Sequence, residues 1–211
     1  MQLLAMLTMF MDHIGKIFFP DEQTWRFIGR IAFPIYCYCI VLGYHRTRDM
    51  GRYFARLLVI GLLSQLPYML AFNTVGVNVI GTLLVSLAVL YALDRLKGRI
   101  TLQVLVVLIA CMGLDALPFD YGSYGLLLVL IYRYAREHTH TVVGMHLLLN
   151  VAFILYKGWT IQMASLIVTL VLAYAPELFR QLERIQPPKW LWRSFYPVHF
   201  IVLFLIAAFM S

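Results

Sequence analysis

The chain has 211 residues, of which 62% are hydrophobic and 13% charged, and its formal net charge is +7. An ordinary globular domain is roughly half apolar and about a quarter charged, so the composition excludes a typical soluble domain and indicates an integral membrane protein. No basic stripe interleaved with aromatic residues supports nucleic-acid binding. The cysteines Cys37, Cys39 and Cys111 lie in apolar runs, which predicts core thiols rather than disulfides or a zinc site.

The first apolar stretch, residues 3–19, contains three ionisable side chains, Asp12, His13 and Lys16. Charged groups at membrane depth are costly, so they usually face a polar interior and mark a functional site. The stretch has neither a basic n-region nor a convincing cleavage site of small residues. We therefore expect a retained helix rather than a signal peptide.

The rest of the chain is a series of apolar runs, each close to the roughly 20 residues that cross a bilayer, separated by charged or Gly/Pro-containing breaks. These runs predict a single all-α bundle of about nine transmembrane helices, at residues 3–19, 27–44, 53–72, 75–93, 100–117, 121–134, 142–156, 161–178 and 192–210. The sixth and seventh are short for a full crossing, so we expect a tilted, broken or re-entrant segment there. One transmembrane domain would then cover residues 1–211.

Arginine and lysine gather in alternate connections, at residues 46–52, 95–99, 133–136 and 180–193, whereas the connections between them carry almost none. Basic residues near the ends of spans are retained on the cytoplasmic side, which predicts a cytoplasmic N-terminus and a C-terminus outside. Topology and attraction to anionic headgroups then explain most of the positive charge. The arginines at the cytoplasmic ends, Arg56 among them, could also hold the phosphates of a cofactor.

Helix geometry and order along the chain suggest which polar groups meet. Asp12 and Lys16 share a helix face, and His13 projects about a quarter turn away. The second span runs back from the outside and brings Arg30 to the depth of Asp12, so an Asp12–Arg30 ion pair is expected. Pro34 leaves a backbone carbonyl without its usual donor, and a kink there would open room for a ligand.

Other spans also contribute polar side chains, namely Gln65, Asn78, Tyr121, Tyr196 and His199. A lone polar residue in a membrane helix more often joins helices than catalyses a reaction, but two intramembrane histidines, His13 and His199, with a carboxylate and an arginine indicate function. Neutral histidine can accept a proton, and a fixed cation or amide can stabilise an oxyanion. A proton acceptor together with a group that stabilises an oxyanion suits acyl transfer. Because no H-x-x-x-H or H-E-x-x-H pattern occurs, no metal is expected.

A resemblance to a known family extends over nearly the whole chain. The ordered motifs that carry it are Met11-Asp12-His13, Gly29-Arg30-Ile31-Ala32-Phe33-Pro34, Arg56-Leu57, Gln65-Leu66-Pro67-Tyr68, Asn78-Val79-Ile80, Tyr121-Gly122 with Gly125, and Phe195-Tyr196-Pro197-Val198-His199. In this series the chain resembles the TraX family, which includes F-pilin acetylase and is similar to the wider membrane acyltransferases.

The resemblance implies a multi-pass acetyltransferase of the bacterial inner membrane that uses cytoplasmic acetyl-CoA. It implies His13 as the general base, Asp12 as its partner in the Asp-His pair, Arg30 as the Gly-Arg element and His199 as the histidine of the last span. We expect contacts with acetyl-CoA from residues that the motifs share, namely Arg56, Gln65, Asn78, Tyr121 and Tyr196.

The acceptor is expected to be an amine, either a peptide or protein N-terminus or a small molecule, and membrane lipid is the other partner. Transfer to a hydroxyl of a carbohydrate or lipid-linked glycan stays open as an alternative. A small proton-coupled transporter would also use buried Asp, His and Arg with broken helices, although no internal repeat relates the two halves of the chain. A structural or partner-binding protein would need fewer ionisable groups at depth. The sequence does not decide whether His13 or His199 is the base.

Overall fold

The structure is a computed structural model that describes residues 1–184 and 187–210. In these ranges the chain is helical, apart from its connections and an isolated parallel bridge between Val77 and Phe119. The elements are α1 (Gln2–Phe18), α2 (Gln23–Gly29), α3 (Ala32–Arg46), α4 (Met50–Phe72), α5 (Val79–Arg95), α6 (Ile100–Ala116), α7 (Gly122–Tyr134), α8 (Thr139–Lys157), the 3₁₀ helix η1 (Thr160–Ser165), α9 (Leu166–Tyr174), α10 (Pro176–Arg184) and α11 (Lys189–Met210).

The prediction of a helical membrane protein is confirmed at the level of helix length and composition. Within the described residues, four segments are long and apolar enough to cross a membrane: α2 with α3, α4, α8, and α11 from Trp190 onward. A fifth is present if η1 and α9 are counted with α10 as one bent span. The expected spans at 3–19, 75–93 and 121–134 form α1, α5 and α7, whose 17, 17 and 13 residues are shorter than the roughly 20 of a full crossing.

The sixth and seventh spans are expected to be tilted, broken or re-entrant, and the sharp bend in the structure lies in the eighth. The expected seventh span forms α8, a continuous helix of 19 residues. The eighth begins as η1, and the helix pair from Thr160 to Leu182 bends by 101°. Pro176 causes this bend, because its ring disfavours helical geometry at the preceding residue and it cannot continue the helix; Ala175 accordingly has φ −128° and ψ 55°.

The second predicted span is broken where its proline requires. Pro34 has no N–H to donate to the carbonyl of Arg30, four residues earlier. The helix is interrupted between Gly29 and Ala32, which separates α2 from α3. The two intervening residues, Arg30 and Ile31, keep right-handed helical dihedrals, so the interruption does not end the span, and it lies next to the residues that form the candidate site.

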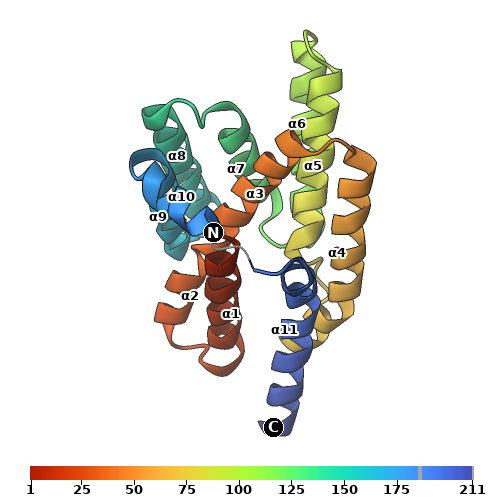
Figure 1. Cartoon of the computed structure of the whole chain (residues 1–211), viewed down its shortest axis with the longest axis vertical. Helices are drawn as coiled ribbons and strands as arrows, with labels where there is room; N and C mark the ends of the chain where they lie inside the picture. The colour runs from red at the N-terminus through yellow and green to blue at the C-terminus, as the bar shows by residue number, and fades with distance from the viewer. Residues whose placement is uncertain (185–186, 211) are drawn as a thin grey trace.

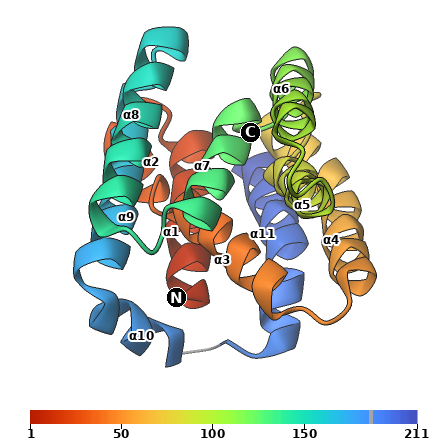
Figure 2. The same cartoon turned by 90° about the horizontal axis from the view of Figure 1, so that it is seen from above.

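The helices form one bundle in which α7 lies near the middle (Figures 1 and 2) and packs against α3, α5 and α8. Its residues Tyr124, Leu128, Val129 and Tyr132 are almost completely buried. At one side, α11 lies along α4 and also contacts α1. The central position of α7 fixes the loop that precedes it, which forms one wall of the candidate site.

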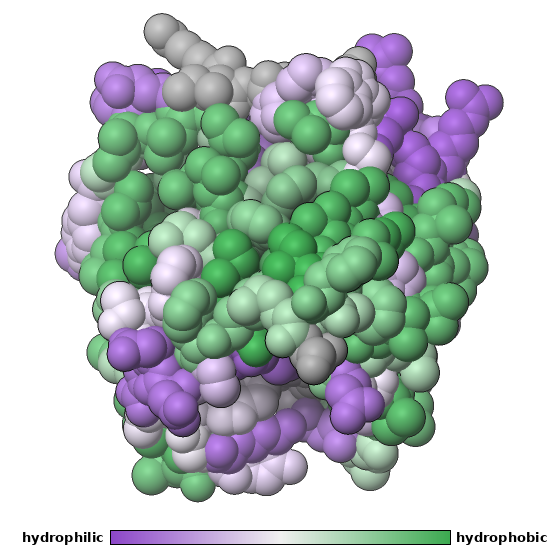
Figure 3. All heavy atoms as spheres, turned by 90° about the horizontal axis from the view of Figure 1, so that it is seen from below, coloured by the Kyte–Doolittle hydropathy of each residue, from purple (hydrophilic) through white to green (hydrophobic). Residues whose placement is uncertain are grey.

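Large apolar side chains cover the outside of the bundle, as lipid contact requires. On α4 and α8, for example, Leu62, Leu66, Leu148 and Leu155 are exposed. Seen from below, hydrophobic side chains occupy the middle of the face, and hydrophilic ones gather toward its margins (Figure 3). A monomeric soluble protein rarely exposes such extensive apolar surface, so this exterior agrees with a membrane protein.

Candidate functional site

A cavity of about 340 Å³ lies between α1, α2, the first turn of α3 and the turn from α8 into η1, with the loop before α7 as a further wall. Ligand sites usually occupy about 300–1,000 Å³, so this cavity suits a small group or the end of a longer molecule. Six ionisable residues line it: Asp12, His13, Lys16, Arg26, Arg30 and Asp120. The site therefore combines a histidine with both signs of charge.

Asp12 forms the expected ion pair with Arg30 and a second one with Arg26. Its Oδ1 lies 3.5 Å from Arg30 Nη2 and 3.2 Å from Arg26 Nε. The approach depends on Gly29, because a Cβ at that position would lie 2.1 Å from Asp12 Cβ. Lys16 does not pair with Asp12 in the structure; its Nζ lies 3.8 Å from the ring centroid of Phe72. Two arginines thus share a single carboxylate.

His13 and His199 form a hydrogen-bonded pair whose tautomers follow from its partners. His199 Nδ1 lies 2.8 Å from the Phe195 carbonyl oxygen, which can only accept, so Nδ1 carries the proton. In neutral His199 the other nitrogen, Nε2, is then an acceptor, and it lies 2.8 Å from His13 Nδ1. His13 therefore donates from Nδ1 and keeps its lone pair on Nε2. His13 lines the cavity and His199 is not among its lining residues, so of the two it is His13 that a molecule in the cavity can reach.

Arg30 is held by three separate elements. Its Nη1 donates to the Tyr121 hydroxyl at 3.1 Å and to Gln162 Oε1 at 3.3 Å, in addition to the ion pair with Asp12. The Tyr121 ring stacks on Phe33 with centroids 3.7 Å apart. These contacts join α1, η1 and the loop before α7, and they fix a cation at the cavity wall.

The loop that carries Asp120 and Tyr121 is pinned by its backbone. Val77 N donates to the Pro118 carbonyl at 2.8 Å, Asp120 N donates to the Val77 carbonyl at 2.9 Å, and the Thr82 hydroxyl donates to the Asp120 carbonyl at 2.5 Å. Tyr121 has φ +64° and Gly122 has φ +50°. A positive φ at a residue with a side chain is strained and persists only where the surroundings impose it.

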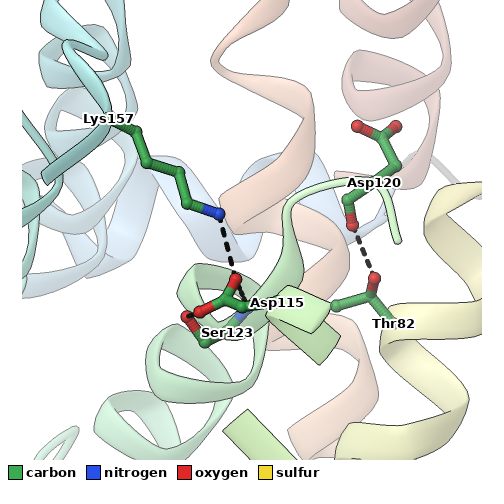
Figure 4. Close-up of polar contacts among 5 residues, drawn as sticks. All are labelled: Thr82, Asp115, Asp120, Ser123 and Lys157. Atoms are coloured by element: carbon green, nitrogen blue, oxygen red, sulfur yellow. Dashed lines mark hydrogen bonds and ion pairs between the residues drawn. The ribbon is translucent and has the colours of Figure 1, made fainter. Parts of the chain in front are cut away.

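Asp115, at the end of α6, anchors the other side of this loop (Figure 4). Its carboxylate accepts hydrogen bonds from the backbone N–H of Ser123, at 3.1 Å, and from the Ser123 hydroxyl. It also forms an ion pair with Lys157 Nζ at 3.0 Å. Asp115 thereby satisfies a free N–H at the start of α7 and ties α6 and α7 to the end of α8.

Asp120 presents its carboxylate to the cavity. The backbone of this residue makes the contacts described above, and in Figure 4 its side chain points away from Thr82 and from the Asp115 cluster. Burial raises the pKa of the Asp120 carboxyl, whereas the charges of Lys16 and Arg30 oppose that shift.

Sequence reasoning did not identify Asp120, Arg26 or Gln162 as site residues, because each lies in a connection or next to a helix break rather than within a continuous polar pattern.

The residues expected to contact acetyl-CoA do not all gather here. Tyr121 lines the cavity, but Arg56, Gln65, Asn78 and Tyr196 are not among its lining residues. Gln65 and Asn78 bond to each other at 2.9 Å, and Asn78 also accepts from Ile80 N as the N-cap of α5. Arg56 Nε donates to the Arg52 carbonyl on α4. Contact of these four residues with acetyl-CoA stays a prediction.

Among the described residues, no group of three or more His, Cys, Asp and Glu side chains has positions suited to a metal ion. No disulfide joins Cys37, Cys39 or Cys111 within the described residues. The ionisable side chains that line the cavity are a histidine, two arginines, a lysine and two carboxylates.

Comparisons with known proteins cover nearly the whole chain. A family model described as TraX protein matches residues 1–207, a range that includes every residue lining the cavity and His199. The chain is similar to the probable fimbrial assembly protein FimC, serogroup H1, of Dichelobacter nodosus, at 26% identity over 96% of this chain and 92% of that relative. No solved structure matches.

Proposed function

The chain belongs to the TraX family, and on this premise we propose that it is a membrane-embedded acetyltransferase. It moves the acetyl group of cytoplasmic acetyl-CoA to an amine at or across the cell membrane. The relative named as a fimbrial assembly protein favours the N-terminus of a fimbrial or pilus subunit as the acceptor. The observation that carries the proposal is the 2.8 Å contact between His13 and His199, which leaves an unprotonated His13 nitrogen beside the cavity.

In the proposed reaction, His13 Nε2 removes a proton from the attacking nitrogen as the C–N bond forms at the thioester carbonyl carbon. The C–S bond then breaks, and the thiolate of CoA receives a second proton from the reacting nitrogen. His199 does not contact the reacting atoms; it is a positioning residue that holds His13 in the required tautomer. Such proton transfer typically contributes about 10²–10⁴-fold to a rate.

The arginines supply stabilisation of the negative charge that develops on the carbonyl oxygen. Asp12 neutralises one positive charge, while Arg26 and Arg30 together carry two. The surplus charge is held by fixed contacts in a water-poor site, where preorganised cations and donors stabilise an oxyanion most effectively. Asp12 thus orients both arginines without cancelling their combined charge.

The topology that we propose has nine helical crossings, with the N-terminus in the cytoplasm and the C-terminus outside. The cavity is lined by the connections that carry few basic residues, at residues 118–121 and 158–162, so it belongs to the outer half of the bundle. A cavity of about 340 Å³ accommodates the thioester end of acetyl-CoA with an acceptor amine. The nucleotide would remain at the basic cytoplasmic loops, where arginine suits phosphate.

The proposal is tested by incubating the purified protein in liposomes with radiolabelled acetyl-CoA and peptides that have a free N-terminus. We expect transfer by the wild type and a loss of about 100-fold or more in the His13→Ala variant. The control is His138→Ala, which removes an exposed histidine from the start of α8 and should leave the rate unchanged. Wild-type transfer by His13→Ala would exclude His13 as the base.

One feature supports a transporter as the second candidate. The 3₁₀ segment η1 contributes Thr160, Ile161 and Gln162 to the cavity and leads into the 101° bend. Broken helices beside a buried polar site are typical of secondary transporters. Uptake of a peptide into liposomes without incorporation of label would favour this reading over acetyl transfer.

A further inference from the structure

One carboxylate that lines the cavity, that of Asp120, forms no ion pair with a side chain of the described residues. Asp12 is committed to Arg26 and Arg30, and Asp115 is committed to Ser123 and Lys157. The carboxylate of Asp120 also lines the cavity, but in the described part of the chain no side chain forms an ion pair or hydrogen bond with it, and its partner is the backbone N–H of Tyr121. A partly buried carboxylate that no cation of the chain neutralises is unfavourable, so its retention beside the cavity requires a reason.

The ammonium group of Lys16, which could pair with Asp120, contacts an aromatic ring instead. Lys16 lines the same cavity, yet its ammonium lies 3.8 Å from the centroid of the Phe72 ring, in a cation–π contact. No ion pair within 4.0 Å joins it to Asp120 in the described residues. The space beside Asp120 is therefore available to a cation from outside the chain.

The position of this carboxylate is unusually well fixed. Its own N–H and carbonyl are both hydrogen-bonded, to Val77 and Thr82. The next residue, Tyr121, is held at φ +64° with its hydroxyl bonded to Arg30. Preorganisation of this kind lowers the entropic cost of binding a ligand group, and it is not needed for a carboxylate that only faces solvent.

We infer that Asp120 is the subsite for the amino group of the acceptor, which enters the cavity as a positively charged ammonium. This inference rests on the proposed function and adds the residue that selects the charged nitrogen. Three cations line the cavity and would repel an ammonium that lacked a carboxylate partner. Asp120 offsets that repulsion, and a neutral hydroxyl acceptor would gain much less from it.

The reaction balances with an ammonium as the substrate. His13 Nε2 removes one proton, which frees the nitrogen lone pair to attack the carbonyl carbon of the thioester. As the C–N bond forms and the C–S bond breaks, the nitrogen gives a second proton to the departing thiolate. The products are the amide, the free thiol of CoA and one proton, which leaves from His13.

The first test is a binding measurement that does not depend on turnover. The probes are glycyl-phenylalanine amide, which carries an ammonium, and glycoloyl-phenylalanine amide, in which a hydroxyl replaces it. We expect the full-length wild type in detergent micelles to bind the ammonium probe at least about 10-fold more tightly, as a charged hydrogen bond allows. Asp120→Asn should abolish this preference and Asp120→Glu should retain part of it. The control, Asp21→Asn, removes an exposed carboxylate outside the cavity and should leave the preference unchanged.

The second test uses acetyl transfer. Asp120→Asn should raise KM for the ammonium probe by at least about 10-fold while kcat changes by less than about 3-fold, because the lost contact is a binding contact. A merely structural role would instead weaken both probes equally. Equal binding of the two probes to the wild type, binding of neither, or an unchanged preference in Asp120→Asn overturns the inference. Absence of acetyl transfer by the wild type would overturn the proposed function, and the binding comparison would still decide the role of Asp120.

Discussion

His199 should act on catalysis through the tautomer of His13 rather than by contact with substrate. In His199→Ala, His13 Nδ1 loses the acceptor that lies 2.8 Å away, so its proton is free to occupy Nε2 and block the base. We expect kcat to fall roughly 10–100-fold with little change in KM for the acceptor. His199→Gln should recover part of the rate, because an amide oxygen can accept the Nδ1 proton. Equal loss in both variants would point to a role for His199 itself as a base.

The site residues that can be predicted from the sequence are ionisable side chains that interrupt apolar runs. Asp12 and His13 interrupt an apolar run, and Arg30 follows at matching depth, so their proximity could be predicted; the Asp12–Arg30 pair is present at 3.5 Å. Arg26 could not be predicted as a site residue, because a basic residue beside Trp25 in a connection is typical of the boundary between membrane and water. It enters the site only because α2 begins already at Gln23 and turns Arg26 toward Asp12.

The connection between α6 and α7 should be sensitive to substitution at its residues of positive φ. In Gly122→Ala, the added Cβ would lie 2.5 Å from Asp115 Oδ1 at a residue with φ +50°. We expect destabilisation of about 1–3 kcal/mol from backbone strain and from disturbance of the cap, together with weaker binding in the cavity. The measurement is unfolding of the purified protein in detergent by heat.

Gly144→Ala is the matched control for this substitution. Gly144 lies within α8, and its added Cβ would meet no atom within 4 Å. Alanine is favoured over glycine in a helix by about 1 kcal/mol, so stability should be unchanged or slightly higher. If both variants unfold at the same temperature as the wild type, the loop before α7 does not hold the strain that its dihedral angles indicate.

The elements differ in how far the sequence predicts them. Apolar runs bounded by proline or charge give α4, α8 and α11 nearly at their observed limits, because length and hydropathy alone define them. The bend at Pro176 was not predicted, whereas the shortness of residues 121–134 suggested a tilted, broken or re-entrant span there. In the structure, α7 is a short, buried helix that neighbouring helices enclose, and the bend arises at Pro176. Burial of a helix by its neighbours depends on tertiary packing, so it cannot be predicted from the residues of that helix alone.

The cavity is a property of the whole molecule. Its walls come from α1, α2, the loop before α7 and η1, and His199 reaches it from α11, so residues that are 186 positions apart act together. The sequence suggests the participants by their type, and it leaves their distances open because these depend on how every intervening helix packs. Parallel placement of α1 and α11 (Figure 1) is what brings His13 and His199 together.

The same placement makes the topology testable. Both α1 and α11 run toward the end of the bundle that carries the C-terminus (Figure 1), as the proposed topology with an odd number of crossings requires. With basic loops retained inside, the turn after α1 should face outward and the turn after α5 should face the cytoplasm. In a variant with Cys37, Cys39 and Cys111 replaced by alanine, we expect Asp21→Cys to react with a membrane-impermeant maleimide in intact cells. Lys97→Cys should react only after the membrane is opened.

Both labelled positions are exposed in the structure, so a difference between them reports the side of the membrane rather than burial. Acetyl transfer by the cysteine-free protein is the control for its fold. Reaction of Lys97→Cys alone in intact cells would reverse the orientation and place the cavity in the cytoplasmic half. Acetyl-CoA would then reach His13 directly, and the acceptor would have to enter from the cytoplasm, because a cavity of about 340 Å³ leaves no room for both whole molecules from one side.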